Sequence, residues 1–460
     1  MIVDRIFTPG LAQVAYLIAD DAAGEVAVID PRRDVDAYIV WADERGYRIT
    51  AILETHIHAD FVSGSRELAV RTGAPLYASA IGKQEFPHTP IPDGQSVSVG
   101  SLSLRAFWTP GHTPEHIAWL LFDPAQGEDP VALFSGDALF VGDVGRPDLL
   151  GEDQVQTLAT KLFYTVVGRL CRLPSNVIVY PGHTAGSACG KKIGEAPYTT
   201  IGAERVGNYA FQARSRDSFV QMVLSGMPPA PTYYPVLKTV NKHGATPLAE
   251  LPAPAALELE RVTAAAGAGA VIIDARPFED FGAGHIPGAV AAGLGENFVA
   301  WMGWLAPYDR DIVLILPSDD HLDEAVTDLR RIGLDRIAGY LAGGMAAWRA
   351  SGRDVATLPQ MTAPELAGQL NNHRIILDVR SDEEWQSEHI PGAVHLYAGK
   401  IAQGADPDLP KDAEIRVICG SGYRSSFVAS LLLQRGYRHL INVDGGMDAW
   451  NQRKLPVTRS

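Results

Sequence analysis

The chain has 460 residues, of which 46% are hydrophobic and 20% are charged, and its 54 acidic against 39 basic residues give a formal net charge of -15. These values are typical of a soluble globular protein with roughly two to four domains, and the acidic balance argues against a nucleic-acid partner, which needs a basic surface. No stretch reaches the ~18 apolar residues needed to span a bilayer, and the N-terminus lacks the basic and apolar regions of a signal peptide. The cysteines are too few for a disulfide framework, so we expect reduced thiols in the cytoplasm.

The N-terminal part, residues 1–246, predicts a layered α/β domain. Short apolar runs separated by Gly, Pro and Asp predict strands at residues 26–29, 51–53, 102–107, 131–134 and 177–180. Helical patterns lie between them, at residues 65–72 and 154–170. Because a polar loop follows each strand, we expect the chemistry of this domain to be carried by strand-end loops.

Side chains that bind metals follow several of these strands. The first loop, residues 55–61, reads Thr-His-Ile-His-Ala-Asp-Phe and carries two imidazoles and a carboxylate at alternate positions. Later loops are Thr-Pro-Gly-His-Thr at 109–113, Ser-Gly-Asp at 135–137 and Pro-Gly-His at 181–183. Histidine and aspartate at such turns can converge on one ion. The candidate ligands are His56, His58, Asp60, His112, Asp137 and His183.

These ordered motifs resemble those of the metallo-β-lactamase superfamily, and the resemblance covers residues 1–246. It implies an αββα sandwich with metal between the sheet edges. Most hydrolytic members have a histidine directly after the aspartate of the first motif, which completes a second metal position. Phe61 stands there in this chain, and this departure argues against a two-zinc hydrolase.

The pattern is more similar to the persulfide dioxygenase branch. The resemblance implies one mononuclear Fe(II) held by His56, His112 and Asp137, with open positions for a persulfide and for O2 as co-substrate. Auxiliary groups that orient ligands or bound water would be His58, Asp60 and His183. Direct ligation by His58 stays open.

Two further residues are candidates for substrate binding. Cys189 lies in the segment 181–191, which resembles the version found in bacterial dioxygenases fused to rhodanese domains. It lies six residues after His183, so it could contact or transiently capture the substrate sulfur; the alternative is a small buried hydrophobic residue. Arg146 could pair with a substrate carboxylate or form a loop salt bridge. The sequence leaves both choices open.

The second half of the chain contains an internal repeat. Residues 274–290 match residues 378–394, and Gly-Gly-Met-x-Ala-Trp follows later in both copies. Each copy opens with a short apolar strand that ends at an aspartate and continues with alternating strand and helix patterns. The copies predict two α/β domains with parallel sheets, at residues 257–356 and 360–460.

The second copy carries a cysteine in a setting that stabilises an anion. Cys419 stands at a predicted strand end and is followed by Gly-Ser-Gly-Tyr, Arg424 and a helical pattern. Backbone N–H groups and the helix dipole would stabilise its thiolate or persulfide, and Arg424 would donate to an anionic sulfur substrate. These residues resemble the rhodanese domains, which transfer sulfane sulfur through a cysteine persulfide, and the resemblance implies that Cys419 is catalytic.

The first copy departs from this pattern. Its equivalent region, residues 314–321, reads Leu-Ile-Leu-Pro-Ser-Asp-Asp-His, with no thiol and with two aspartates that would repel an anion. We therefore expect no sulfur transfer there. Spacing, docking or dimer contact is the expected role, and a homo-oligomer stays open.

Over nearly the whole chain, the domain order resembles the bacterial persulfide dioxygenase–sulfurtransferase fusions of sulfide and persulfide detoxification. The resemblance implies oxidation of a low-molecular-weight persulfide to sulfite, joined to sulfur transfer among persulfide, thiol and sulfite, with thiosulfate as one product. Two alternatives are a zinc thioester hydrolase of the glyoxalase II kind and a non-catalytic sulfur-carrier protein. The sequence leaves open which thiol carries the persulfide.

Overall fold

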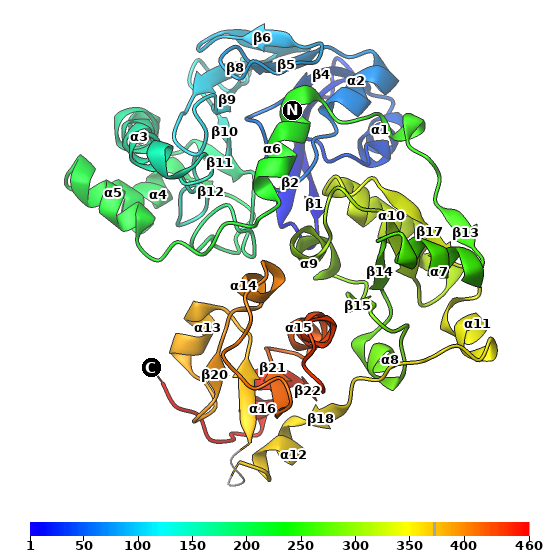
Figure 1. The fold of residues 1–460 in the computed structure, drawn as a ribbon. Helices are drawn as coiled ribbons and strands as arrows, with labels where there is room; N and C mark the ends of the chain where they lie inside the picture. The colour runs from blue at the N-terminus through cyan, green and yellow to red at the C-terminus, as the bar shows by residue number, and fades with distance from the viewer. Residues whose placement is uncertain (371–373, 460) are drawn as a thin grey trace. The chain divides into compact units, whose positions relative to one another are not determined.

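The computed structural model describes residues 1–370 and 374–459. It divides into two compact units, Met1–Leu251 with Arg330–Gly333, and Pro252–Leu329 with Leu334–Ser460 (Figure 1). Among the described residues, no helix combines the length and the apolarity that a bilayer crossing requires.

The first unit contains two six-stranded sheets. The first sheet, in the order β1-β2-β3-β4-β5-β6, is formed by β1 (Ile2–Thr8), β2 (Gln13–Asp20), β3 (Glu25–Ile29), β4 (Arg48–Leu53), β5 (Leu76–Ser79) and β6 (Thr89–Ile91). β1, β2 and β3 pair antiparallel, whereas β3 to β6 are parallel. Because β3 and β4 end side by side, Asp30 after β3 lies next to the loop that begins at Glu54.

The second sheet carries the other three predicted ligand loops, between β8 and β9, after β10 and after β11. Its order is β12-β11-β10-β9-β8-β7, formed by β7 (Ser96–Val99), β8 (Leu102–Trp108), β9 (Ile117–Phe122), β10 (Ala132–Gly136), β11 (Ile178–Pro181) and β12 (Thr199–Thr200). β10 and β11 are parallel, and the other neighbours are antiparallel. The loops after β10 and β11 therefore leave the same edge of the sheet.

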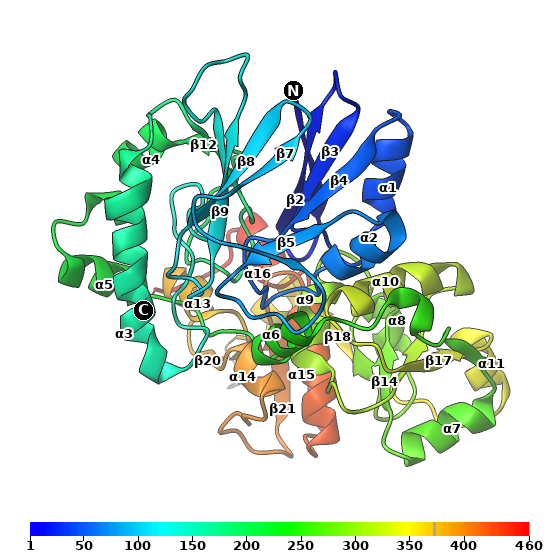
Figure 2. The ribbon, with the colours of Figure 1, turned by 90° about the horizontal axis from the view of Figure 1, so that it is seen from above.

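The inner faces of the two sheets share one hydrophobic core. Tyr16 and Leu53 of the first sheet and Trp119 and Phe134 of the second are buried in it. α1 (Asp36–Asp43) and α2 (Ser65–Thr72) cover the outer face of the first sheet, and α3 (Glu152–Phe163), α4 (Ile201–Gly207) and α5 (Arg216–Leu224) cover that of the second (Figure 2). The predicted αββα sandwich is confirmed.

The second unit contains two five-stranded parallel sheets, one for each repeat. The first, in the order β13-β17-β16-β14-β15, is formed by β13 (Ala255–Leu257), β14 (Val271–Asp274), β15 (Val290–Ala291), β16 (Ile312–Ile315) and β17 (Ile337–Leu341). The second, in the order β18-β22-β21-β19-β20, is formed by β18 (Gln360–Thr362), β19 (Ile375–Asp378), β20 (Val394–His395), β21 (Glu414–Ile418) and β22 (His439–Asp444). The predicted parallel α/β fold of the repeats is confirmed.

Helices surround both sheets of the second unit. The first repeat contains α7 (Leu259–Gly267), α8 (Phe278–Ala283), α9 (Phe298–Leu305), α10 (Leu322–Arg331) and α11 (Gly344–Ala350). The second repeat contains α12 (Ala363–Ala367), α13 (Asp382–Ser387), α14 (Ala398–Ala402), α15 (Tyr423–Gln434) and α16 (Gly446–Gln452). Their arrangement repeats, as expected for two copies of one domain.

The two repeats of the second unit share a continuous core. α9 of the first repeat packs on α15 of the second, where the rings of Trp301 and Phe427 have centroids 4.7 Å apart. Nearby, the Tyr423 hydroxyl donates to the Gly293 carbonyl over 3.1 Å. These contacts bring the first repeat to the loop that carries Cys419.

Candidate metal centre and thiol pocket

Three buried side chains converge at strand ends in the first unit. His56 follows β4, His112 lies between β8 and β9, and Asp137 follows β10. One ligand atom from each lies within 4.8 Å of the others. Nε2 of His112 is 3.4 Å from Oδ2 of Asp137, and Nε2 of His56 is 4.0 Å from the same oxygen. The structure thus brings together the three residues predicted to bind one ion.

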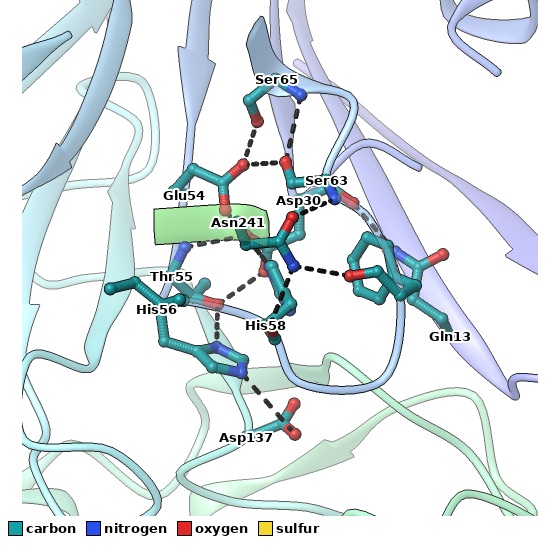
Figure 3. Close-up of polar contacts among 12 residues, drawn as sticks. Gln13, Asp30, Glu54, Thr55, His56, His58, Ser63, Ser65, Asp137 and Asn241 are labelled. Carbon is teal, nitrogen blue, oxygen red and sulfur yellow. Dashed lines mark hydrogen bonds and ion pairs between the residues drawn. The ribbon is translucent and has the colours of Figure 1, made fainter. Parts of the chain in front are cut away.

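The hydrogen bonds of the two histidines leave one nitrogen of each ring available for a metal. Thr55 Oγ1 donates to Oδ2 of Asp30 over 2.7 Å, so it accepts the Nδ1 proton of His56 over 2.8 Å (Figure 3). Nδ1 of His112 donates to the Arg146 carbonyl over 2.9 Å. Each ring is thereby held as the tautomer whose Nε2 carries a lone pair.

The acceptor atoms that face one another here have no hydrogen-bond partner among the residues that the structure describes. They are Nε2 of His56, Nε2 of His112 and both carboxylate oxygens of Asp137. Burial lowers the pKa of both histidines well below the ordinary value and raises the pKa of Asp137 to about 6. An unsatisfied buried polar group costs about 1–3 kcal/mol, and a divalent cation would satisfy all of these atoms together. Two neutral imidazoles and one carboxylate therefore fit a metal ion.

His58 lies outside this ligand set. Its Nε2 is 3.2 Å from Oδ1 of Asp30 and 3.3 Å from Oε2 of Glu54, and Glu54 in turn accepts hydrogen bonds from the hydroxyls of Ser63 and Ser65 (Figure 3). Burial alone would lower the pKa of His58, but the two carboxylates outweigh it and raise that pKa well above the ordinary value. These contacts tie the ligand loop to the ends of β3 and β4, and His58, Asp30 and Glu54 form a further group of side chains that could hold a metal ion.

A second group of potential metal ligands lies next to Oδ1 of Asp137. Nε2 of His183 is 3.6 Å from Oδ1 of Asp137 and 3.3 Å from Oδ2 of Asp60. Cys189 completes this group, because its Sγ lies within 4.8 Å of ligand atoms of Asp60 and His183. Burial, reinforced by the charges of Asp60 and Asp137, raises the pKa of the Cys189 thiol well above the ordinary value. Cys189 therefore faces the predicted auxiliary residues as a neutral thiol.

Arg146 is engaged within its own loop network. Its buried guanidinium pairs with both carboxylate oxygens of Asp148, over 2.7 and 2.8 Å. It also donates to the carbonyls of Ala188 and Pro228, over 3.1 and 2.8 Å. Of the two roles left open for Arg146, the structure shows the loop salt bridge. The residue still bears on the metal centre, because its carbonyl orients His112.

Helix α6 (Tyr234–His243) touches the ligand loop from a segment without a recognisable motif. The Asn241 side chain donates to the carbonyls of His58 and Phe61, over 2.9 and 2.7 Å, and accepts from the backbone N–H of Ser63 over 2.9 Å. The Asn241 amide thus forms hydrogen bonds with the ligand loop at three positions. The Tyr234 hydroxyl, at the other end of the helix, lies 3.9 Å from Sγ of Cys189.

Lys238 adds a positive charge to the same site. It lies about one helical turn from both Tyr234 and Asn241, and therefore on the face of α6 that touches the centre. Its charge, added to burial, lowers the pKa of His112. No motif marks this lysine in the sequence, since its place depends on how α6 packs. Asp30 was also missed, although its position directly after the predicted strand 26–29 is a signal that could have found it.

The predicted sulfur-transfer thiol lies directly after β21 in the second unit. Cys419 is 1% exposed, the backbone N–H of Gly422 donates to its Sγ over 3.1 Å, and the Ser425 hydroxyl donates over 3.4 Å. Gly422 has a φ of 107°, a conformation that a residue with a side chain rarely adopts. These donors and the N-terminus of α15 favour negative charge on the sulfur.

A pocket of about 280 Å³ opens at the Cys419 loop. Side chains that line it are Asn297, Trp301, Glu384, Ser421, Tyr423, Arg424 and Asp448. Arg424 donates to both oxygens of Glu384, over 2.7 Å each. Burial acts to raise the pKa of Glu384, but the paired guanidinium outweighs it and lowers that pKa to about 2. Arg424 thus lines the pocket with its guanidinium paired to a carboxylate that the sequence did not reveal, and its role as a donor to an anionic sulfur substrate stays a prediction.

The first repeat has no counterpart of the Cys419 loop. The segment after β16 forms a short 3-10 helix, Asp319–His321, in which the Ser318 hydroxyl and Nδ1 of His321 are 2.9 Å apart. Its two aspartates stand in the first turn, and no cysteine is present there.

Comparisons with known proteins match both units. The Metallo-beta-lactamase superfamily matches residues 8–183, and the Rhodanese-like domain matches residues 258–351 and 362–453. The crystal structure of a metallo-β-lactamase from Staphylococcus aureus is similar with a TM-score of 0.67 at 35% identity, over 74% of this chain and 98% of that one.

Curated relatives match the first unit. A hydroxyacylglutathione hydrolase from Polaromonas sp. is 36% identical over 187 residues, and a mitochondrial persulfide dioxygenase from Bos taurus is 32% identical over 184 residues. The matches span 40% and 39% of this chain and 66% of each relative, just under two thirds of their length. Because the hydrolase and the dioxygenase are identical to this chain to a similar degree, sequence similarity alone does not distinguish a hydrolase from a dioxygenase.

Proposed function

Because the chain belongs to the family in which a metallo-β-lactamase domain is fused to rhodanese domains, we propose that it is a mononuclear iron persulfide dioxygenase joined to a sulfurtransferase. The first unit oxidises a low-molecular-weight persulfide with O2, and the second passes sulfane sulfur through Cys419. The substrates are small thiols, their persulfides, and sulfite or thiosulfate.

The ligand set of the first unit is the observation that carries the proposal. His56, His112 and Asp137 present their orphaned acceptor atoms to one point. His58, which could have been a fourth ligand, instead faces Asp30 and Glu54, over 3.2 and 3.3 Å. Iron bound by two imidazoles and one carboxylate supplies open positions for a thiolate sulfur and for O2.

Phe61 supports one ion over two. It occupies the position that a histidine fills in most hydrolytic members, and its buried ring lies 4.4 Å from the ring of His58. An aromatic ring there contributes no ligand atom and keeps water away from that side of the loop. This feature favours the dioxygenase over the hydrolase.

The surrounding residues would bind and orient the persulfide. Lys238 offers a positive charge to an anion that enters the centre. Cys189 and Tyr234, whose pKa values are raised well above their ordinary values by burial, stay neutral and present polar groups without adding negative charge. The overall reaction balances as persulfide, O2 and water giving thiol, sulfite and two protons.

The second unit would carry out sulfur transfer. The Cys419 thiolate attacks the outer sulfur of a persulfide, the bond between the two sulfurs breaks, and the organic thiolate leaves and takes up a proton. Sγ of Cys419 then carries the persulfide, stabilised by Gly422 and Ser425. Transfer of that sulfur to sulfite forms thiosulfate and restores the thiolate, so the product of the first unit can be consumed by the second.

Oxygen uptake by the whole chain, loaded with Fe(II) under anaerobic conditions, tests the dioxygenase. The persulfides of glutathione, cysteine and coenzyme A should be offered beside their thioesters, with sulfite and free thiol quantified. We expect O2 consumption matched by sulfite with at least one persulfide, and no thioester hydrolysis. Thioester turnover without O2 consumption would contradict the proposal.

A zinc thioester hydrolase is the second candidate, and one observation favours it. Asp60, His183 and Cys189 form a donor group next to Asp137, so Asp137 could bridge two ions. The relation to hydroxyacylglutathione hydrolases points the same way. Two zinc ions per chain, with hydrolysis of glutathione thioesters, would select this candidate.

A further inference from the structure

The two repeats differ at one position next to the thiol loop. The matched segment reads Gly-Gly-Met-Ala-Ala-Trp in the first repeat and Gly-Gly-Met-Asp-Ala-Trp in the second, so that Asp448 stands where the copy without a thiol has Ala346. The backbone N–H of Asp448 donates to the carbonyl of Gly420 over 2.9 Å. Asp448 is therefore fixed to the residue that follows Cys419, and its exposed side chain lines the pocket.

The charges that face the pocket sum to a negative value. Arg424 and Glu384 neutralise each other through two hydrogen bonds. Asp448 then adds a carboxylate for which the described residues show no ion pair within 4.0 Å. An inorganic dianion such as thiosulfate meets this carboxylate as it approaches Cys419, whereas a cationic group is attracted to it.

The first repeat also contributes to the pocket lining, with side chains suited to an organic molecule. Trp301 and Asn297 present an indole ring and an amide. The indole packs against two other rings, with its centroid 4.7 Å from that of Phe427 and 6.4 Å from that of Tyr397. A rigid indole face attracts an ammonium group, and the volume of about 280 Å³ accommodates a small thiol.

We propose that the Cys419 pocket selects low-molecular-weight organic persulfides that carry an ammonium group over thiosulfate, and that Asp448 is the residue that determines this specificity. In the preferred reaction, the Cys419 thiolate attacks the outer sulfur, the sulfur–sulfur bond breaks, and an ammonium-bearing thiolate leaves and takes up a proton. With thiosulfate the same attack releases sulfite, and the entering dianion is repelled. Sulfite as an acceptor meets the same repulsion, so Asp448 disfavours both inorganic dianions relative to organic thiols and excludes neither. The proposal rests on the sulfurtransferase half of the proposed function.

Steady-state kinetics of the whole chain test the proposal with matched donors. Cysteine persulfide and the persulfide of 3-mercaptopropionate differ only by the ammonium group, and thiosulfate is the third donor. The wild type should prefer cysteine persulfide over the other two. Asp448→Asn and Asp448→Ala should raise kcat/KM for thiosulfate about tenfold and reduce the preference for the ammonium-bearing donor by a similar factor, mainly through KM.

Asp412→Asn is the matched control, because Asp412 is an exposed carboxylate outside the pocket, 3.5 Å from Arg438. Asp412→Asn should leave kcat/KM unchanged for all three donors. Asp448→Ala introduces the residue that the first repeat carries in the same turn, and a thermal melt like that of the wild type shows that it folds. Equal donor preferences in the wild type and in both Asp448 variants would overturn the proposal. Failure of the sulfurtransferase half of the proposed function is a different result: the wild type would then transfer sulfur from none of the three donors, or Cys419→Ser would transfer it as fast as the wild type.

Discussion

The metal centre and the thiol pocket have opposite electrostatic surroundings. At the metal centre, acceptor atoms of His56, His112 and Asp137 have no hydrogen-bond partner among the described residues, and Lys238 adds a positive charge. At the thiol pocket, backbone and hydroxyl donors already bond the sulfur of Cys419, and Asp448 adds a negative charge. The first site is incomplete without an ion, whereas the second is built from the chain alone. The metal centre therefore depends on a bound ion and the thiol pocket on Cys419. A substitution at one site should leave the activity proposed for the other site intact.

His112→Ala should have the largest effect of these substitutions, and it acts on the metal centre. It removes one of three ligands, so bound iron should be lost and O2 uptake should fall by at least about 100-fold, since even outer partners of a ligand are worth 10–100-fold. Metal analysis and an oxygen electrode provide the measurements. His243→Ala, at an exposed position on α6, is the control; retention of full iron by His112→Ala would break the assignment.

Cys419→Ser should affect only the thiol pocket. Sulfur transfer should be abolished, because the hydroxyl does not form a persulfide, while O2 uptake should stay within about twofold of the wild type, as expected for independent sites that share no residue. Thiosulfate formation from a persulfide and sulfite, and O2 uptake, are measured on one preparation. Cys171→Ser, at a half-buried cysteine outside both sites, should change neither value. Joint loss of both activities in Cys419→Ser would mean that the sites cannot be separated.

Thr55→Val should sharpen the account of the metal centre with a smaller effect. The valine keeps the shape but removes the oxygen that accepts the Nδ1 proton of His56, so iron affinity should fall about 10–100-fold. Titration with Fe(II) under anaerobic conditions measures this change. Thr50→Val on β4 is the matched control, since Oγ1 of Thr50 has no hydrogen-bond partner in the described part of the chain. An affinity equal to that of the control would show that Thr55 does not orient His56.

The pair of Glu384 and Arg424 should give the smallest effect, in the thiol pocket. The pKa of Glu384 is lowered from 4.5 to about 2 in the folded chain. The stability from this pair is therefore fully present above about pH 4.5 and is lost as the pH falls toward 2. Because the Glu384 side chain is 37% exposed, solvent screening limits the contribution to about 1 kcal/mol.

Urea unfolding of the wild type and of Glu384→Gln between pH 7 and pH 3 measures this contribution. The free energy of unfolding should differ between them at neutral pH, and the difference should shrink below pH 4.5. Glu383→Gln, at the exposed neighbouring position, should match the wild type throughout. A difference that grows on acidification would contradict the pairing.

The residues that could be predicted were those fixed by their place on a strand. His56, His112 and Asp137 follow apolar strands, and strand ends in a layered sheet meet at one edge, so their convergence was accessible from the sequence. α2 at Ser65–Thr72 was likewise readable from its helical pattern. Cys419 was recognisable because a glycine loop and a helix follow it directly.

The residues that could not be predicted depend on packing between distant segments. His58 differs from His56 only through contacts with Asp30 and Glu54, which a one-dimensional pattern does not show. Lys238 reaches the centre because α6 packs across the ligand loop. The pairing of Arg424 joins two helices of the second repeat, and a short sequence motif contains only one of the partners.

The number of metal ions bound per chain tests the central claim most directly. The whole chain should be stripped of metal, loaded anaerobically with Fe(II) or with Zn(II) in excess, and analysed after removal of free ions. The account predicts one ion per chain with either metal, and loss of that ion in Asp137→Asn. Two ions per chain, with the second lost on substitution of Asp60 or His183, would contradict it.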